Sequence, residues 1–247
     1  PKRSGSAHII GESPKSVYTS TVTSSFAKNG KVAIVMLSRE AGESNDVARD
    51  VVAGTSDLAL DQNEKDMLSL IKQYKDNGTF TKVIALINTS NAMEVHWFDE
   101  YGIDAALWIG GPGNSTGFRG VADLLTGASN PSGRLVDTYA TNSLSAPATV
   151  NFGEFTYTNR TEVAQAYQNL TDAGYYVVHQ EGIYVGYKYY ETRYEDAILG
   201  QGGATANVGL WASKDGKWDY AAEVAYPFGY GLSYTTFTQT MDSAQDN

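Results

Sequence analysis

Three short, continuously apolar segments most constrain what this chain can fold into. They are KVAIVML (31–37), KVIALIN (82–88) and IDAALWI (103–109), and all are rich in aliphatic and β-branched residues. Strands with one solvated face alternate apolar and polar residues, whereas uninterrupted apolar runs are typical of parallel strands covered on both faces. The three segments therefore predict a mostly parallel sheet sandwiched by helices, which is an α/β fold.

The connections between these strands carry helical patterns. In LDQNEKDMLSLIKQYKDNG, apolar residues recur along one helical face, Asp61 is a candidate N-cap, and Asn77-Gly78 marks the helix end. Further helices are predicted at about 93–100 and about 115–126. This alternation predicts right-handed strand–helix–strand crossovers.

The rest of the chain divides into segments that differ in composition and periodicity. Residues 1–30 are polar with little periodicity, and we expect an arm or linker that lies on a surface. After about residue 140 the chain is rich in Tyr, Thr, Asn and Gly without helical periodicity, which predicts an irregular final third with loops, hairpins and short strands. We predict one α/β domain at 31–237, followed by a tail or linker at 238–247.

Composition excludes several classes of function. The net charge of -10 argues against nucleic acid and anionic membranes as partners, because both would repel this chain. No apolar stretch reaches the roughly 20 residues that span a bilayer. There is no cysteine, so disulfides, thiolate nucleophiles and cysteine metal sites are excluded. The first residues lack the apolar centre of a secretory signal, and localisation stays open between cytoplasm and exterior.

Open parallel sheets bind ligands at the carboxyl ends of their strands, and two stretches lie there. GGPGNSTG (110–117) leads into a predicted helix and could cradle a phosphate with backbone N–H groups. It matches neither common phosphate-binding glycine pattern and has no Lys, so tight turning and close helix packing are the favoured interpretation.

The second stretch, SREAGESNDV (38–47), places three acids and one arginine after the first strand. An acidic loop is more often solvated than catalytic, and it could also bind Mg²⁺ or Ca²⁺, although it lacks the EF-hand spacing. His8, His96 and His179 show no ligand spacing, so no metal is expected. No cofactor is expected either, and no G-x-S-x-G is present for a serine hydrolase. For the dense tyrosines, packing is favoured over an aromatic wall that stacks on sugar rings.

Four stretches together resemble family 3 of the glycoside hydrolases. SREAGESND is similar to the Ser-Arg-x-x-Gly-Glu-x-x-Asp loop of the family's sandwich domain, and NPSGRL (130–135) to its hallmark turn. EGIYVGYKYYET (181–192) and YPFGYGLSYTTF (226–237) are similar to two further signatures, in the same order. The resemblance implies the α/β sandwich domain of a β-glucosidase-like enzyme.

The resemblance also implies roles for residues of the acidic loop. Glu43 stands at the position of the acid/base glutamate, whereas Glu40 stands where the family is variable and is the weaker alternative. Arg39 and Asp46 match the flanking pattern, and we expect them to hold the loop in shape by ion pairing or hydrogen bonding. In the retaining mechanism, one carboxylate attacks the anomeric carbon while a second carboxyl group protonates the departing oxygen and then activates water.

The family's nucleophile belongs to a (β/α)₈ barrel, which this chain cannot form because it holds only about three strand–helix units. We therefore expect an incomplete fragment that is inactive alone. Its expected partners are the barrel domain of the same enzyme, placed before or after it, and a β-glucoside or oligosaccharide substrate. The Tyr-rich surface is expected at the missing interface, and homo-oligomer formation through it is left open.

The favoured function is hydrolysis of terminal non-reducing β-D-glucosyl residues. Within the family, β-xylosidase, arabinosidase and exo-glucanase specificities are alternatives. Outside it, the alternatives are a non-catalytic carbohydrate-binding or scaffolding module, which the retained Glu43 motif disfavours, and a doubly wound nucleotide-binding domain, which the missing phosphate motif disfavours.

Overall fold

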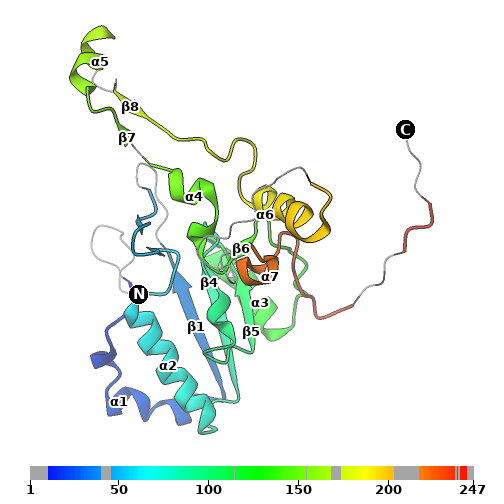
Figure 1. The fold of residues 1–247 in the computed structure, drawn as a ribbon. Helices are drawn as coiled ribbons and strands as arrows, with labels where there is room; N and C mark the ends of the chain where they lie inside the picture. The colour runs from blue at the N-terminus through cyan, green and yellow to red at the C-terminus, as the bar shows by residue number, and fades with distance from the viewer. Residues whose placement is uncertain are drawn as a thin grey trace.

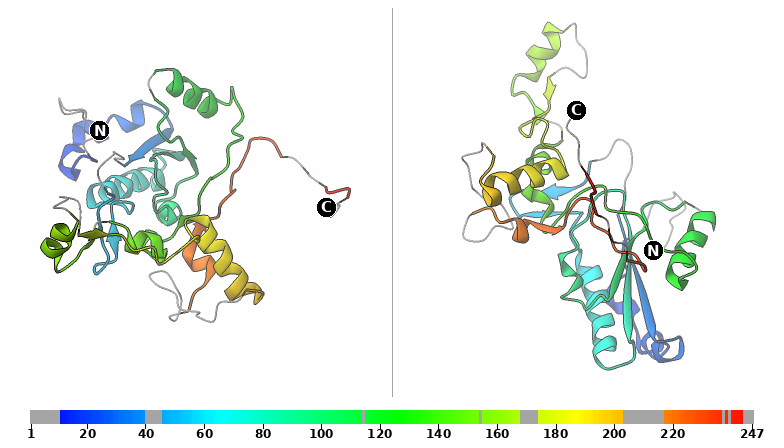
Figure 2. Two further views of the ribbon diagram at one scale, coloured as in Figure 1. Left: turned by 90° about the horizontal axis from the view of Figure 1, so that it is seen from above. Right: turned by 90° about the vertical axis from the view of Figure 1, so that its right-hand side faces the viewer.

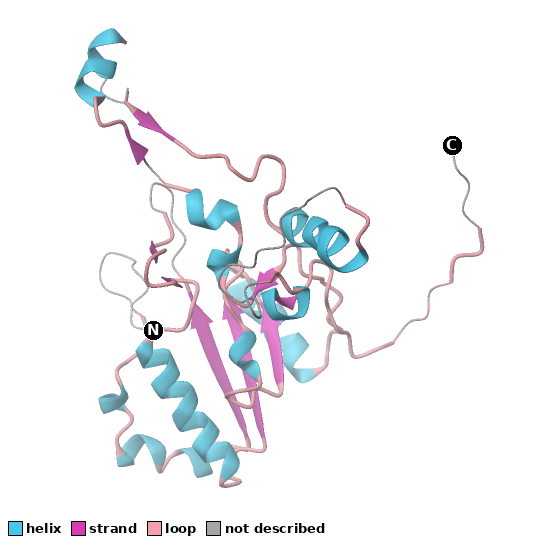
Figure 3. Cartoon of the chain, in the orientation of Figure 1, coloured by secondary structure: helices cyan, strands magenta, loops and turns pink. Residues whose placement is uncertain are grey.

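A computed structural model describes residues 11–39, 46–113, 115–153, 155–167, 174–202, 217–236, 238 and 240–243. The three apolar segments form a parallel sheet of β1 (Val32–Ser38), β4 (Lys82–Asn88) and β5 (Ala105–Trp108), in the order β1-β4-β5. The predicted α/β fold is confirmed. All three carboxyl ends point to one edge of the sheet, beyond which the chain is mostly loop with short helices and strands (Figures 1 and 3).

Helix α2 (Gln62–Asp76) confirms the predicted helix between the first two strands of the sheet. A carboxylate oxygen of Asp61 accepts a hydrogen bond from the Glu64 backbone N–H at 2.8 Å, and the Glu64 carboxylate accepts one from the Asp61 N–H at 2.9 Å. This reciprocal capping box satisfies two backbone donors that helix geometry leaves open. The apolar face of α2 packs into the main core with the sheet, through Met67, Leu68 and Ile71.

The other two predicted helices differ in outcome. α3 (Ser115–Thr126) has the predicted bounds, whereas the segment at 93–100 forms only one short 3₁₀ turn, η3 (His96–Phe98). A side chain at Gly117 would collide with the carbonyl of Pro112, so the turn into α3 requires glycine there. This close approach agrees with the tight-turn interpretation of the glycine-rich stretch.

Helices cover one face of the sheet better than the other. The central strand β4 is buried along most of its length, but Val32 and Ile34 of β1 are 47% and 53% exposed, and Ala105 and Ala106 of β5 are exposed. In the part of the chain that the structure describes, the expected cover on both faces is therefore correct for β4 and wrong for β1 and β5. The reason is that α2 packs into the main core with the sheet, whereas no described residue of α3 belongs to that core.

Short elements make up the rest of the described chain. Before β1 lie η1 (Lys15–Val17), α1 (Ser20–Thr23) and η2 (Phe26–Lys28). Three antiparallel pairs follow: β2 (Arg49–Asp50) with β3 (Thr55–Ser56), β6 (Tyr139–Ala140) with β9 (Val224–Tyr226), and β7 (Phe155–Thr156) with β8 (Tyr175–Tyr176). The remaining helices are η4 (Ser143–Ser145), α4 (Pro147–Asn151), α5 (Arg160–Ala166), α6 (Tyr187–Tyr194), the π-helical η5 (Glu195–Leu199) and α7 (Tyr220–Glu223).

The final third confirms the predicted irregular, strand-containing texture, but its helices were not predicted. The longest, α6, is rich in tyrosine, whose strand preference hides the helical pattern. Tyr190 on α6 is 3% exposed, so packing rather than local preference holds this helix in place. None of the helices in the described part of the chain is long and apolar enough to cross a membrane.

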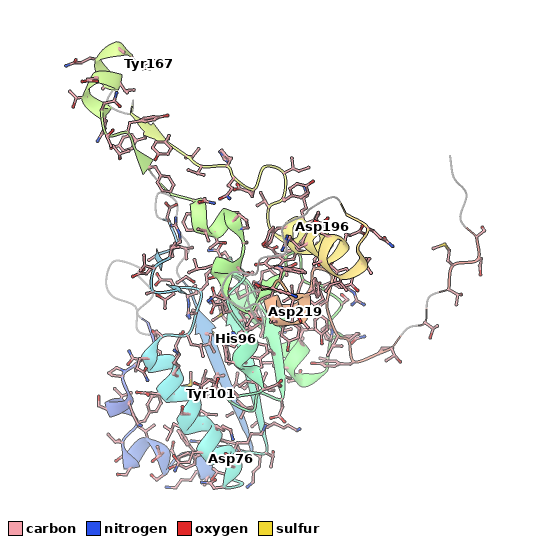
Figure 4. All side chains as sticks on the ribbon, in the orientation of Figure 1. Asp76, His96, Tyr101, Tyr167, Asp196 and Asp219 are labelled. Atoms are coloured by element: carbon pink, nitrogen blue, oxygen red, sulfur yellow. The ribbon has the colours of Figure 1, made fainter. Side chains whose placement is uncertain are left out.

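Strands β7 and β8, with α5 between them, project from the body as an arm (Figures 1 and 2). The Tyr176 ring lies 5.5 Å from the Phe155 ring and 4.7 Å from the Tyr157 ring, and the Arg160 guanidinium lies 4.1 Å from the Tyr175 ring centroid. Tyr167, 63% exposed, marks the outer end of the arm (Figure 4). Of the four arm tyrosines, Tyr157 and Tyr176 therefore pack on each other, and all four stay at least 36% exposed.

A second core cluster joins α6, α7 and β9, and it encloses an acid. Glu223 is 0% exposed, and its carboxylate lies near the Ser145 hydroxyl without an aligned hydrogen bond to it. Burial raises the pKa of Glu223 from 4.5 to about 7; the Ser145 hydroxyl and the Arg193 guanidinium oppose the rise, and the charge of Asp219 adds to it. The apolar members of the cluster are Ala140, Ala146, Tyr190, Trp218 and Val224.

The buried acid predicts how stability depends on pH. Because the pKa of Glu223 is higher in the folded state, the folded protein binds more protons between about pH 4.5 and pH 7, and stability falls as pH rises through this window. Glu223→Gln should remove this fall. Its unfolding free energy should match that of the unsubstituted chain below this window and exceed it by about 3 kcal/mol above it.

Urea unfolding at a series of pH values measures this difference. The matched control is Glu195→Gln, because Glu195 is exposed on the neighbouring η5. The control should keep the pH dependence of the unsubstituted chain. Parallel curves for Glu223→Gln and the unsubstituted chain would contradict the prediction.

Candidate functional site

The acidic loop leaves β1 at the carboxyl edge of the sheet, as the sequence predicts. Its two candidate acids, Glu40 and Glu43, lie outside the described residues. The flanking residues Arg39 and Asp46 are described. The site is therefore described below through the residues on either side of the loop and through the nearby cavity.

Arg39 holds the chain immediately before the loop. Its Nη1 donates to Glu64 Oε1 at 2.6 Å and its Nη2 to Glu64 Oε2 at 2.8 Å, which is the paired geometry that best suits guanidinium and carboxylate. The Arg39 and Glu64 side chains are only 13% and 5% exposed. Arg39 also donates to three backbone carbonyls, those of Ser38, Asp57 and Ala59.

The chain after the loop packs against residues 150–153. Gly153 has a φ of +111°, a backbone conformation that favours glycine. If residue 153 carried a Cβ, that atom would lie 3.6 Å from Asp46 Oδ2, so Asp46 lies next to Gly153. The Arg49 guanidinium donates to the carbonyls of Val150 and Phe152 and lies 3.8 Å from the Phe152 ring centroid. Arg39 before the acidic loop and Arg49 after it are thus held by contacts to segments far away in the chain.

A cavity of about 420 Å³ lies at this edge, within the range of about 300–1,000 Å³ that is usual for ligand sites. Its wall is formed by residues at the carboxyl ends of β4 and β5, in the segment after α3 and at the start of α6. Its wall includes Arg49, Asn91, Trp108, Asp137, Thr138, Tyr139, Phe152, Gly186 and Tyr190.

Trp108 stands at the carboxyl end of β5 and is the half-exposed aromatic residue of this wall, at 44% exposure. Its Nε1 donates to the Thr89 carbonyl at 2.9 Å, which fixes the indole orientation. A Cβ at Gly110 would lie 2.9 Å from the indole, and Gly110 has a φ of +55°, so glycine is required there. The indole is therefore held in one pose.

Hydroxyl groups in the wall stay protonated at neutral pH. Burial and the charge of Asp137 raise the pKa of Tyr139 to about 12. Burial also raises the pKa of Tyr190, although its hydrogen bond with the Ser145 hydroxyl, at 2.7 Å, opposes this. Asp137 accepts a hydrogen bond from the Thr138 N–H at 2.8 Å. The cavity thus combines aromatic faces with hydrogen-bonding groups.

Sequence reasoning singled out none of these wall residues. Trp108 could have been found, because it ends the third apolar run at the edge where ligands bind. Tyr190 falls inside one of the four signature stretches, but nothing local shows which tyrosine of that run turns inward.

Neither of the two histidines that the structure describes lines this cavity. His96 is exposed on η3, and His179 is exposed with its Nδ1 3.6 Å from Glu181, while His8 lies outside the described residues. Among the described residues, no three His, Asp or Glu side chains gather closely enough to hold a metal ion.

Comparison with known proteins agrees with the fold and the motifs. Residues 12–187 match the model of the glycosyl hydrolase family 3 C-terminal domain. The chain belongs to this family. The resemblance found from the four motifs is confirmed.

Relatives with known names are β-glucosidases. One from Ruminococcus albus is 30% identical over 211 residues, and β-glucosidase A of Butyrivibrio fibrisolvens is 29% identical over 223 residues. These matches cover 85% and 83% of this chain but only 16% and 21% of the relatives. The family 3 chain therefore spans about a fifth of the length of these relatives.

Solved structures show the same fold. A β-glucosidase from Paenibacillus barengoltzii superposes with a TM-score of 0.60 and 26% identity, covering 89% of this chain and 18% of that one. The β-D-glucoside glucohydrolase of Trichoderma reesei matches with a TM-score of 0.51 and 22% identity, covering 87% of this chain and 23% of that one. Because its identity is only 22%, the second match supports the shared fold alone.

The Arg39–Glu64 pair predicts a large stability effect. Arg39→Ala leaves the buried carboxylate of Glu64 without its charge partner, and breaking a buried pair in this way costs about 3–5 kcal/mol. The unfolding free energy, measured in urea, should fall by that amount.

The matched control is the exposed pair of Lys72 and Asp76, 2.7 Å apart on α2. Lys72→Ala should cost less than about 0.5 kcal/mol, because exposed i,i+4 pairs are weak. A loss for Arg39→Ala no larger than that for Lys72→Ala would show that the buried pair does not anchor the start of the loop.

Proposed function

We propose that this chain is the acid/base domain of a retaining β-glucosidase that hydrolyses terminal non-reducing β-D-glucosyl residues. One observation carries the proposal: in a family 3 C-terminal domain, the loop that carries Glu43 runs between Arg39 and Arg49, whose side chains are held by distant segments, and Arg49 lines a cavity at the carboxyl edge of the sheet. The names of the relatives from Ruminococcus albus and Butyrivibrio fibrisolvens support glucose as the sugar that is released.

In the proposed reaction, a carboxylate of the barrel attacks the anomeric carbon, and the bond from that carbon to the leaving oxygen breaks. Glu43 gives its proton to the leaving oxygen as the glycosyl–enzyme ester forms. Glu43 then takes a proton from water, whose oxygen attacks the anomeric carbon and releases the barrel carboxylate. Glucose leaves with the original anomeric configuration, and Glu43 is protonated again.

The contacts of Arg39 suit a proton donor nearby. An uncompensated guanidinium at the start of the loop would lower the pKa of a neighbouring carboxyl group and ionise it. Glu64 neutralises Arg39 through two hydrogen bonds, so the guanidinium can shape the loop without this effect. We therefore assign Arg39 and Asp46 the role of positioning the loop. Glu40 is the weaker alternative to Glu43 as the acid/base residue.

The nucleophile in this proposal belongs to a (β/α)₈ barrel outside these 247 residues. The domain at 31–237 supplies the proton donor and one side of the substrate pocket, and the barrel supplies the attacking group and the grip on the terminal glucose. The chain alone then does not cleave a glycoside. This division suits a chain that covers 16% to 21% of its β-glucosidase relatives.

Glu43→Gln in the complete enzyme tests the acid/base assignment. The kcat/KM for cellobiose should fall by about 10²–10⁴, because general acid–base catalysis contributes that much. A dinitrophenyl β-glucoside, whose leaving group needs no proton, should form the glycosyl–enzyme ester at a nearly unchanged rate. Azide should restore turnover of that substrate and yield β-glucosyl azide.

The control is Glu40→Gln, which should keep most of the activity towards both substrates. An undiminished cellobiose rate in Glu43→Gln would refute the assignment. Separately, the 247-residue chain should not hydrolyse an aryl β-glucoside, and turnover at the rate of the complete enzyme would refute the assignment of the nucleophile to another domain.

A further inference from the structure

The two ends of the acidic loop are joined by the backbone of one residue, Asp57. Its N–H donates a hydrogen bond to the carbonyl of Ala48, directly after the loop, at 2.9 Å. Its carbonyl accepts a hydrogen bond from the Nε of Arg39, directly before Glu40. The stretch from Arg39 to Ala48, which carries Glu43, is therefore closed by the peptide groups of a single residue.

Asp57 depends on its neighbours to hold this position. It is exposed, so its two backbone hydrogen bonds compete with water. On one side, Leu58 is buried in the main core, and its carbonyl accepts a hydrogen bond from the Glu94 N–H at 2.9 Å. On the other side, the hydroxyl oxygen of Ser56 lies 2.7 Å from that of Ser143. We call the segment Ser56–Leu58 the clamp, because both ends of the loop rest on it.

A chain of hydrogen bonds connects the clamp to a buried acid, Glu94. Its Oε1 accepts from the Ser143 N–H at 2.8 Å and from the Ser143 hydroxyl at 3.0 Å. Because a carboxylate only accepts hydrogen bonds, the Ser143 hydroxyl donates to Glu94, and the Ser56 hydroxyl donates to Ser143. Ser56 Oγ in turn accepts from the Leu58 N–H at 3.2 Å. The carboxylate thus sets the direction of every hydrogen bond that reaches the clamp.

The burial of Glu94 makes these contacts strong. Glu94 is 6% exposed and Ser143 is 8% exposed. None of the ion pairs between described residues includes Glu94. A buried carboxylate without a cation is stabilised by its hydrogen bonds, and bonds to a charged acceptor are about twice as strong as neutral ones. An uncharged side chain in this place would hold Ser143 less firmly.

We propose that Glu94 is a positioning residue for the acid/base reaction, because it holds, through Ser143 and Ser56, the clamp on which the Glu43 loop rests. The role in the reaction rests on the proposed function, whereas the clamp rests on the contacts alone. Among the described residues, Ser56, Leu58 and Ser143 line the cavity but Glu94 does not. A change at Glu94 therefore reaches the substrate only through the clamp.

Two substrates with different leaving groups test this role in the complete enzyme. Glu94→Gln keeps the shape of the side chain and removes its charge. The kcat/KM for cellobiose should fall at least about fivefold, the equivalent of one lost hydrogen bond, because the proton donor is misplaced. The rate of glycosyl–enzyme formation from a dinitrophenyl β-glucoside should stay unchanged, because its leaving group needs no proton. A merely structural role would lower both rates by the same factor.

Amide hydrogen exchange tests the clamp without catalysis. In the complete enzyme, peptides that cover residues 48–58 should exchange at least about fivefold faster in Glu94→Gln, whereas peptides from α2 should be unchanged. Ser56→Ala removes the last hydroxyl of the chain of hydrogen bonds and leaves the buried acid in place. It should give the same faster exchange, and it tests the clamp even if Glu94→Gln does not fold.

Ser69→Ala is the matched control. Ser69 is exposed on α2, and its hydroxyl donates to the Lys65 carbonyl at 2.7 Å, so the variant also loses one serine hydrogen bond. Both substrate rates and the exchange of residues 48–58 should stay as in the unsubstituted enzyme.

The outcomes separate the clamp from the proposed function. Unchanged exchange in both Glu94→Gln and Ser56→Ala would overturn the clamp. Equal losses with both substrates, or a cellobiose loss in Ser56→Ala without one in Glu94→Gln, would overturn the positioning role. An undiminished cellobiose rate in Glu43→Gln together with faster exchange in Glu94→Gln would refute the proposed function while confirming the clamp.

Discussion

The paired hydrogen bonds between Arg39 and Glu64 are the interaction on which the carboxyl edge of the sheet depends. Glu64 caps its own helix through Asp61, so the same carboxylate that starts α2 also holds the end of β1. Arg39 extends this connection to the carbonyls of Asp57 and Ala59, on the chain that leads into α2. Strand end, helix start and connecting segment are therefore one unit, and the acidic loop begins from it.

A second set of contacts links the cavity to the interior. Tyr190 lines the cavity and also packs in the cluster around Glu223, where its hydroxyl meets that of Ser145. Trp108 enters the same wall from the sheet, held by the Thr89 carbonyl. The wall is thus built from elements that also pack the core, which favours a preformed pocket over one assembled from mobile loops.

The sequence predicted the elements that depend on local pattern. The apolar runs were correct as strands, and α2 and α3 were found because caps, glycines and one apolar face mark their bounds. The prediction did not find α6, because a run of tyrosines has no helical signature of its own and α6 is held by the packing of Tyr190. Cover on both faces of β1 was also wrong, because an apolar run does not say how many helices pack on it.

The candidate site divides in the same way. The four motifs led to the family and to Glu43 and its flanks, because a motif records which residue types a loop needs at which spacing. They could not show that Arg39 bonds Glu64, or that Trp108, Thr138 and Arg49 share one cavity, because these residues are tens of positions apart. Periodicity, caps and motif spacing are properties of neighbouring residues and can be read along the chain. Which distant side chains meet, and which polar atoms are left without partners, depends on how the elements pack in space.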